Sequence, residues 1–237
     1  MIETKLVLLE GPPGSGKTTT AQKLANEILK IGEECQCFLE WSEDNPIAIG
    51  DDFNLGQVIT TSITREEDVL RQWQQFVRAN LPGKRITVME SRFWQTSMML
   101  MYAAGHSMDR VIASNQRIID TIQELKPVLI YFTVDDLRSF TEQVIRLKEN
   151  EWRKAGFEGS WADHILVAFE SQPWFKEHGL TGLEGMVSFL EEWASITELL
   201  YNRLAFPKIR IRNPHKDWVL TMQQIRNFLG LGGLDKM

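Results

Sequence analysis

The sequence predicts an α/β fold in which a doubly wound sheet of five parallel strands is covered by helices on both faces. The first observation is that five short apolar runs alternate with segments of helical periodicity along the 237 residues. The second is a glycine-rich turn between the first apolar run and the first helical pattern. Because parallel strands need long crossovers, usually helices, this alternation favours a parallel sheet. The five runs are 6–9, 35–39, 86–89, 128–134 and 208–212.

Loop signals and side-chain alternation support these strands. The third run follows Leu81-Pro82-Gly83 and the fourth follows Lys126-Pro127, and both are typical loop endings. In the fifth run, Ile209 and Ile211 alternate with basic residues, which is typical of a strand at the edge of a sheet.

The helical patterns are strongest after the first run and in the C-terminal half. Apolar residues recur at helical spacing in 21–29, 137–154 looks helical and becomes basic towards its end, and the pattern returns from Met186. Five glycines and Pro173 punctuate residues 156–185, which predicts a looser stretch there. We therefore expect one domain over residues 1–237, with a helical lid region at about 137–185.

The glycine-rich turn carries the most specific signal in the chain. Residues 11–18 read G-P-P-G-S-G-K-T and match the phosphate-binding pattern G-x-x-x-x-G-K-[ST]. In such a loop, backbone N–H groups and the N-terminus of the following helix face an anion. Lys17 would reach the β- and γ-phosphates, and the Thr18 hydroxyl would hold Mg²⁺. The sequence thus predicts a site for ATP and Mg²⁺. The residues expected to bind the nucleotide are Gly11, Pro12, Pro13, Gly14, Ser15, Gly16, Lys17, Thr18 and Thr19.

The metal ion needs a second ligand near Thr18. Glu90 directly follows the buried run 86–89, at the end of the sheet where ligands bind, and is the predicted metal partner. Asp135 and Asp136, which follow the fourth run, are the alternative, although an aspartate there is also typical of a helix N-cap.

The transferring phosphate needs cations, and residues 138–154 form the densest basic region. Arg146 and Arg153 are the predicted catalytic cations of a lid that closes and excludes water. The alternative is a solvated helix face on which these arginines pair with glutamates of the same segment.

Residues 31–64 contain seven acidic residues and neither lysine nor arginine. If this stretch borders the acceptor pocket, it suits a neutral or cationic hydroxyl acceptor better than a phosphorylated one. Glu40, at the end of the second run, would then be the general base. A solvated acidic loop is the alternative. The acids are Glu33, Glu34, Glu40, Glu43, Asp44, Asp51 and Asp52.

Composition restricts the partners and the compartment. A net charge of −6 argues against an extended nucleic-acid surface, and no apolar stretch approaches the roughly 20 residues that span a bilayer. The start of the chain does not have the pattern of a signal peptide, and Cys35 and Cys37 fit two reduced cysteines on one strand face. We expect a cytoplasmic protein with a small-molecule phosphate acceptor and neither nucleic acid nor membrane as partner; a homodimer stays an open alternative.

With these motifs, the chain resembles the P-loop nucleoside and nucleotide kinases, especially those of thymidylate-kinase type. The matching segments are 9–11, 14–19 and Arg92-Phe93 followed by Thr96-Ser97, and the last is similar to the family's D-R-Y-x-x-S-S segment. The resemblance implies a nucleotide-kinase-like P-loop fold and implies that Arg92 helps to hold phosphate groups, which makes it a predicted catalytic residue.

The chain also departs from that pattern. The family's Asp before the Arg is Ser91 here, and the R-E-P-G-G segment after the second strand is replaced by 40–43, E-W-S-E. Glu40 matches instead the catalytic Glu that deoxynucleoside kinases, a sister group, place at the end of that strand. The predicted function is an ATP-dependent kinase acting on a nucleoside, nucleotide or similar hydroxyl acceptor. The alternatives are a P-loop ATPase or switch with a macromolecular partner, and a nucleotide-binding protein without catalysis.

Overall fold

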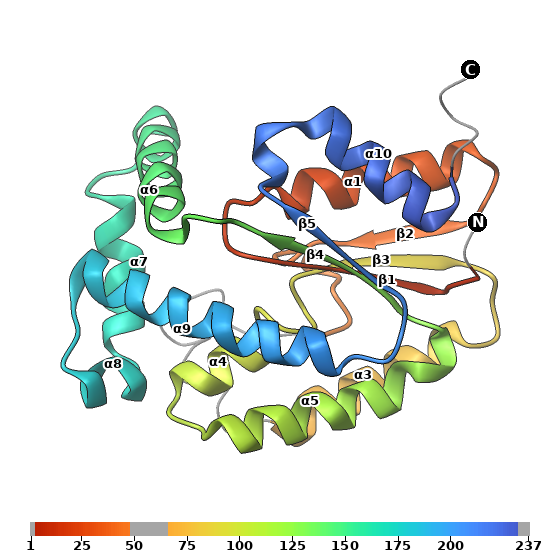
Figure 1. Cartoon of the computed structure of the whole chain (residues 1–237), viewed down its shortest axis with the longest axis horizontal. Coiled ribbons are helices and arrows are strands. Elements are labelled where there is room, and N and C mark those ends of the chain that lie inside the picture. The colour runs from red at the N-terminus through yellow and green to blue at the C-terminus, as the bar shows by residue number, and fades with distance from the viewer. Residues whose placement is uncertain (1–2, 48–65, 232–237) are drawn as a thin grey trace.

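The computed structural model describes residues 3–47 and 66–231, and it has the predicted doubly wound α/β fold (Figure 1). The strands pair in the order β2-β3-β1-β4-β5, and every pairing is parallel. All five predicted strands are confirmed, and β5 lies at an edge of the sheet, as its alternating sequence predicts. The strands are β1 (Leu6–Glu10), β2 (Cys35–Phe38), β3 (Ile86–Glu90), β4 (Val128–Thr133) and β5 (Lys208–Arg212).

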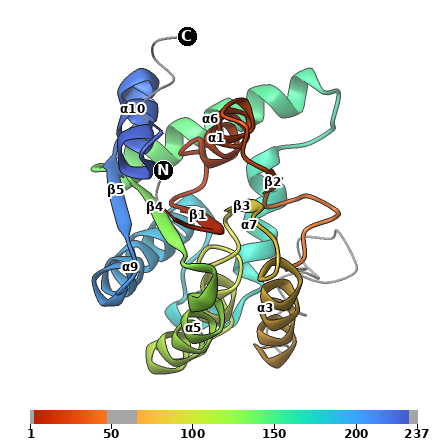
Figure 2. The same ribbon diagram turned by 90° about the vertical axis from the view of Figure 1, so that its right-hand side faces the viewer.

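Helices cover both faces of the sheet, which is why the central strands are mainly apolar (Figure 2). One face carries α1 (Lys17–Lys30) and α10 (Trp218–Leu229), whose buried apolar residues pack on β1, β3 and β4. The opposite face carries α3 (Glu66–Asn80), α5 (Met108–Ile122) and α9 (Gly182–Arg203), together with the short helix α4 (Met98–Ala103). All residues of β1 and β3 are buried, so both strands present fixed ends to the loops that follow them.

Three helices extend beyond the carboxyl ends of the strands, at the left of Figure 1. They are α6 (Leu137–Lys154), α7 (Trp161–Glu170) and α8 (Pro173–His178). The expectation of a looser stretch across 156–185 is therefore wrong. The glycines and the proline mark the ends of short helices: Gly179 ends α8 with a left-handed backbone, and Pro173 is its first residue. Among the described residues, no helix is both long enough and apolar enough to cross a bilayer.

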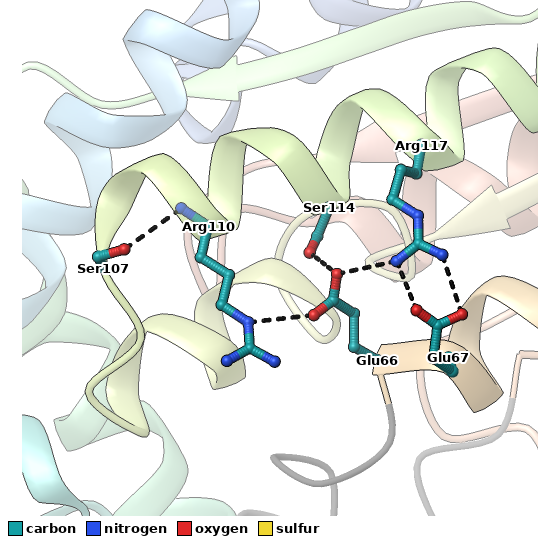
Figure 3. Close-up of polar contacts among 6 residues, drawn as sticks. All are labelled: Glu66, Glu67, Ser107, Arg110, Ser114 and Arg117. Carbon is teal, nitrogen blue, oxygen red and sulfur yellow. Dashed lines mark hydrogen bonds and ion pairs between the residues drawn. The ribbon is translucent and has the colours of Figure 1, made fainter.

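The contact between α3 and α5 includes a charged network around Glu66, the first residue of α3 (Figure 3). The Glu66 carboxylate accepts hydrogen bonds from Ser114 Oγ and from Arg110 Nε at 3.2 Å, and it lies 3.3 Å from Arg117 Nη1. Arg117 also forms a bidentate pair with Glu67 at 2.7 and 2.9 Å. Burial acts to raise the pKa of Glu66, but these hydrogen bonds and charges outweigh it and lower the pKa. The network thus ties the start of α3 to α5.

Replacing Glu66 with glutamine should lower the free energy of unfolding by about 1 kcal/mol, because the neutral amide loses the charge-assisted bonds to both arginines. The effect should become smaller in acid. The pKa of Glu66 is lower in the folded protein than in the unfolded chain, so the stability that its ionised carboxylate contributes is lost as the pH falls through the folded pKa. Urea denaturation at pH 7 and at pH 3 measures both effects. Asp68→Asn, which alters an exposed pair with Arg71, is the control and should change stability by less than about 0.5 kcal/mol. An equal loss in both variants would contradict this role of Glu66.

Candidate active site

The glycine-rich turn lies between β1 and α1, with its glycines in conformations that other residues rarely adopt. Gly11 has φ +149°, and a Cβ there would lie 2.7 Å from the Phe132 carbonyl oxygen of β4. Gly14 has φ +78°, and a Cβ there would lie 2.4 Å from Val144 Cγ2 of α6. The turn therefore passes closely between β4 and α6, at a place where only glycine fits. Such a tight, backbone-lined turn at the start of a helix fits an anion-binding role.

The side chains of this turn point in different directions. Lys17 is buried, and its Nζ donates to the carbonyl oxygens of Gly11 at 2.9 Å and Pro12 at 3.0 Å. The lysine therefore curls back over the turn. Ser15 Oγ is buried without a hydrogen-bond partner, whereas Thr18 and Thr19 are exposed at the start of α1.

The end of β3 brings the predicted metal pair together. Glu90 is buried, and its Oε1 accepts a hydrogen bond from Thr18 Oγ1 at 3.1 Å. Its Oε2 accepts from the backbone N–H of Glu40 at 3.0 Å, which fixes the carboxylate between β2 and the turn. A hydroxyl and a carboxylate in contact are oxygen ligands of the kind that Mg²⁺ prefers, with waters and phosphate completing its shell. The described residues contain no larger cluster of histidine, cysteine and acidic side chains that could hold a metal.

The two aspartates after β4 have other partners. Asp136 is the N-cap of α6, where its carboxylate accepts from the backbone N–H of Ser139 at 2.9 Å. Asp135 is exposed and bonds to Arg212 Nη2 and Asn213 Nδ2, both at 2.7 Å. These contacts favour the N-cap interpretation for Asp136 over a metal-binding pair.

A left-handed turn at Ser91, φ 61°, directs the residues on either side of it towards Glu40. The Arg92 guanidinium donates to the backbone carbonyl oxygen of Glu40, and Gln95 Nε2 donates to Glu40 Oε1 at 3.0 Å. Arg92 is only 4% exposed, and its Nε and Nη1 atoms have no hydrogen-bond partner. Buried donors left unpaired are costly, and a bound ligand is one partner that could satisfy them. Burial lowers the pKa of Arg92 to about 10, so it remains a cation at neutral pH.

Glu40 has the pKa that a general base needs. Burial raises the pKa of this carboxyl to about 7, and the charge of Glu90 adds to the effect, while Lys17 and Arg92 oppose it. Its Oε1 also lies 3.4 Å from Thr96 Oγ1. A carboxyl whose pKa lies near neutral pH is partly ionised at the start of the reaction and can therefore accept a proton.

The predicted lid cations, Arg146 and Arg153, lie on α6. Helix α6 faces a cavity with Val144, Lys148 and other residues at helical spacing, whereas Arg146 and Arg153 are exposed on its other side. Arg146 lies 4.0 Å from Glu142, and Arg153 donates to the Glu149 carbonyl oxygen and to Asn150 of its own helix. Both arginines are thus paired within their own helix, and their catalytic role stays a prediction.

The acidic stretch is mostly solvated. Glu33, Glu34, Glu43 and Asp44 are exposed, and of its described acids only Glu40 lines the cavity. Asp51 and Asp52 lie outside the described residues.

Sequence reasoning assigned no role to Glu10, the last residue of β1. Its buried carboxylate accepts from the backbone N–H groups of Phe93, Trp94 and Gln95 at 2.8, 2.9 and 3.0 Å. Burial raises the pKa of Glu10 to about 7, and these three hydrogen bonds oppose the rise. Glu10 therefore holds the segment that carries Arg92 and Gln95 against the end of β1. An acid that ends an otherwise apolar buried run was the signal available in the sequence.

The comparisons with known proteins concern the fold. No protein-family model matches the sequence, and no curated protein matches it significantly. Among solved structures, deoxyadenosine kinase from M. mycoides with bound dATP matches with a TM-score of 0.49 and 13% identity, over 95% of this chain and 99% of that one. Thymidylate kinase from Ehrlichia chaffeensis matches with a TM-score of 0.38 and 18% identity, over 75% of this chain and 99% of that one. These neighbours belong to the class of kinases that the motifs resemble.

Proposed function

We propose that this protein is an ATP-dependent phosphotransferase that transfers the γ-phosphoryl group to a hydroxyl group of a small molecule. The observation that carries the proposal is the position of Glu40. The backbone of Glu40 contacts both Glu90 and Arg92. The Glu40 carboxyl, with a pKa of about 7, accepts a hydrogen bond from Gln95 and is close enough to Lys17, Glu90 and Arg92 for their charges to act on its pKa. A proton acceptor next to a polyphosphate loop is the arrangement that phosphoryl transfer to an alcohol needs.

The turn 11–19 would hold the triphosphate of ATP through its backbone N–H groups. Lys17 would leave the carbonyl groups of Gly11 and Pro12 and donate to the β- and γ-phosphates instead. Thr18 and Glu90 would hold Mg²⁺, directly or through its waters, and the bound ion would supply positive charge to the phosphates.

The remaining steps belong to side chains of the chain itself. Glu40 Oε1 or Oε2 would take the proton of the acceptor hydroxyl as its oxygen bonds to the γ-phosphorus. The bond from that phosphorus to the β–γ bridging oxygen breaks, and ADP leaves. The Arg92 Nε and Nη1 donors would meet the negative charge that spreads over the transferring group, and Gln95 would hold the carboxylate in place.

An assay of ADP release tests the proposal. The protein is incubated with ATP and Mg²⁺, alone and with nucleosides, nucleoside monophosphates and other alcohols. We expect ADP release that depends on an acceptor. Release at the same rate without any acceptor would favour an ATPase, and ATP binding without release under any condition would favour a non-catalytic binding protein.

A further inference from the structure

A cavity of about 810 Å³ adjoins Glu40 on the side of helices α6, α7 and α9. Its volume lies within the range of roughly 300–1,000 Å³ that binds drug-sized molecules. Glu40, Gln95 and Thr96 form one polar part of the lining and contact one another. Pro13 of the nucleotide turn borders it as well, so the cavity connects the proposed base with the proposed donor site.

The rest of the lining is mainly apolar and aromatic. Helix α6 contributes Val144, Ile145 and Trp152, and helix α7 contributes Trp161 and Ile165. Residues from α4 and α9 add further apolar surface: Met99, Leu100, Met186 and Leu190. A ligand that fills this space removes apolar surface from water, which contributes roughly 25 cal/mol of favourable binding free energy for each Å² buried.

On the helical side of the cavity, the lysine is already paired and two aromatic rings of the lining stack on each other. His164 stacks on Trp152 with ring centroids 5.8 Å apart, and Trp152 stacks on Phe157 at 4.4 Å. Lys148 is the one cation among the described lining residues, and its Nζ lies 2.6 Å from Glu151 Oε2. A phosphorylated acceptor would have to bring its charge into an apolar cavity with one cation that is already paired, which is unfavourable.

From this division of the lining we infer that the acceptor is an uncharged alcohol with a large apolar or aromatic body. The inference rests on the proposed phosphotransferase function and names its substrate class. The hydroxyl lies at the polar end beside Glu40, and the body fills the space between α6, α7 and α9. Transfer then joins the alcohol oxygen to the γ-phosphorus of ATP, moves the alcohol proton to Glu40 and releases ADP.

Binding without ATP tests the inference apart from the chemistry. Titration calorimetry compares 2-phenylethanol and biphenyl-4-ylmethanol, the phosphate ester of each, thymidine, thymidylate and the polycationic alcohol kanamycin. We expect biphenyl-4-ylmethanol to bind at least tenfold more tightly than its phosphate ester and than thymidine, thymidylate or kanamycin. If neither apolar alcohol binds more tightly than its own phosphate ester, or if thymidine, thymidylate or kanamycin binds most tightly, the inference is wrong.

Two variants on α7 locate the binding. Trp161→Ala removes an aromatic wall of the cavity and should weaken the binding of biphenyl-4-ylmethanol roughly tenfold. Val167→Ala is the matched control: this side chain is 68% exposed on the same helix, and binding should stay within twofold. Equal affinities in both variants would place the alcohol elsewhere and overturn the inference.

A parallel titration with ATP and Mg²⁺ separates the two proposals. If the wild-type protein does not bind ATP, the proposed phosphotransferase function is contradicted, whether or not the alcohols bind. Intact ATP binding and turnover with thymidylate, together with no preference for the apolar alcohols, would overturn only the assignment of the acceptor.

Discussion

Lys17→Ala is expected to lower ATP-dependent turnover by a factor of about a hundred or more and to weaken ATP binding, because no other side chain of the turn can bring a cation to the β- and γ-phosphates. Calorimetry with ATP and Mg²⁺ measures the affinity, and ADP release measures the turnover. The lysine also donates to two carbonyl groups of the turn, so thermal unfolding must show that the variant still folds.

Lys23→Ala is the matched control for this variant. Lys23 lies on the exposed side of the same helix, and its removal changes the net charge by the same amount. Its affinity and turnover should stay within twofold of the wild type. Full ATP binding and turnover in folded Lys17→Ala would remove the basis for the nucleotide site.

Glu40→Gln should lower the turnover number with an acceptor by roughly a hundredfold or more, while ATP affinity changes little, since a general base acts on the chemical step. Glutamine keeps the size of the side chain but cannot accept the proton. Glu43→Gln, at an exposed position three residues further along, is the control and should leave turnover unchanged. A change within twofold in Glu40→Gln would rule out the role of a base.

The pKa of Glu40 gives this prediction a pH signature. Because the free carboxyl has a pKa of about 7 and acts as a base only when ionised, kcat/KM should fall about tenfold for each pH unit below 7 and level off above it. The residual activity of Glu40→Gln should lack this step. A wild-type profile without a step between pH 5 and 8 would contradict the assignment.

The sheet could be predicted from the sequence because parallel strands covered on both faces are nearly continuous apolar runs. The same runs place Glu40 and Glu90 at strand ends, where they do contact each other through the Glu40 N–H group. The glycine-rich turn was readable because its spacing is set by phosphate chemistry rather than by packing.

The helical region was less readable. Helices α7 and α8 are short and lie between glycines and a proline, so the breakers obscured their periodicity. On α6, the density of basic residues favoured Arg146 and Arg153, although the 3.6-residue period places Lys148 on the side of Val144. The helical spacing of Val144 and Lys148 could therefore have been recognised in the sequence.

Other features of the site depend on contacts between distant segments. The burial of the Arg92 guanidinium and the hydrogen bonds of Glu10 both require β1 and β3 to lie side by side. The apolar cavity likewise needs α6, α7 and α9 to pack around the end of the sheet. No local pattern specifies such an arrangement, because its parts are far apart in the chain.

The most direct measurement follows the γ-phosphoryl group itself. Wild-type protein is incubated with Mg²⁺, ATP labelled with ³²P at the γ-position, and 2-phenylethanol, biphenyl-4-ylmethanol, thymidine or thymidylate in turn. Chromatography then separates ATP, inorganic phosphate and the phosphorylated acceptor. A phosphotransferase with Glu40 as its base places the label on an acceptor oxygen, and does so far more slowly in Glu40→Gln. Label that appears only as inorganic phosphate, at a rate that no acceptor changes, would contradict the proposed function.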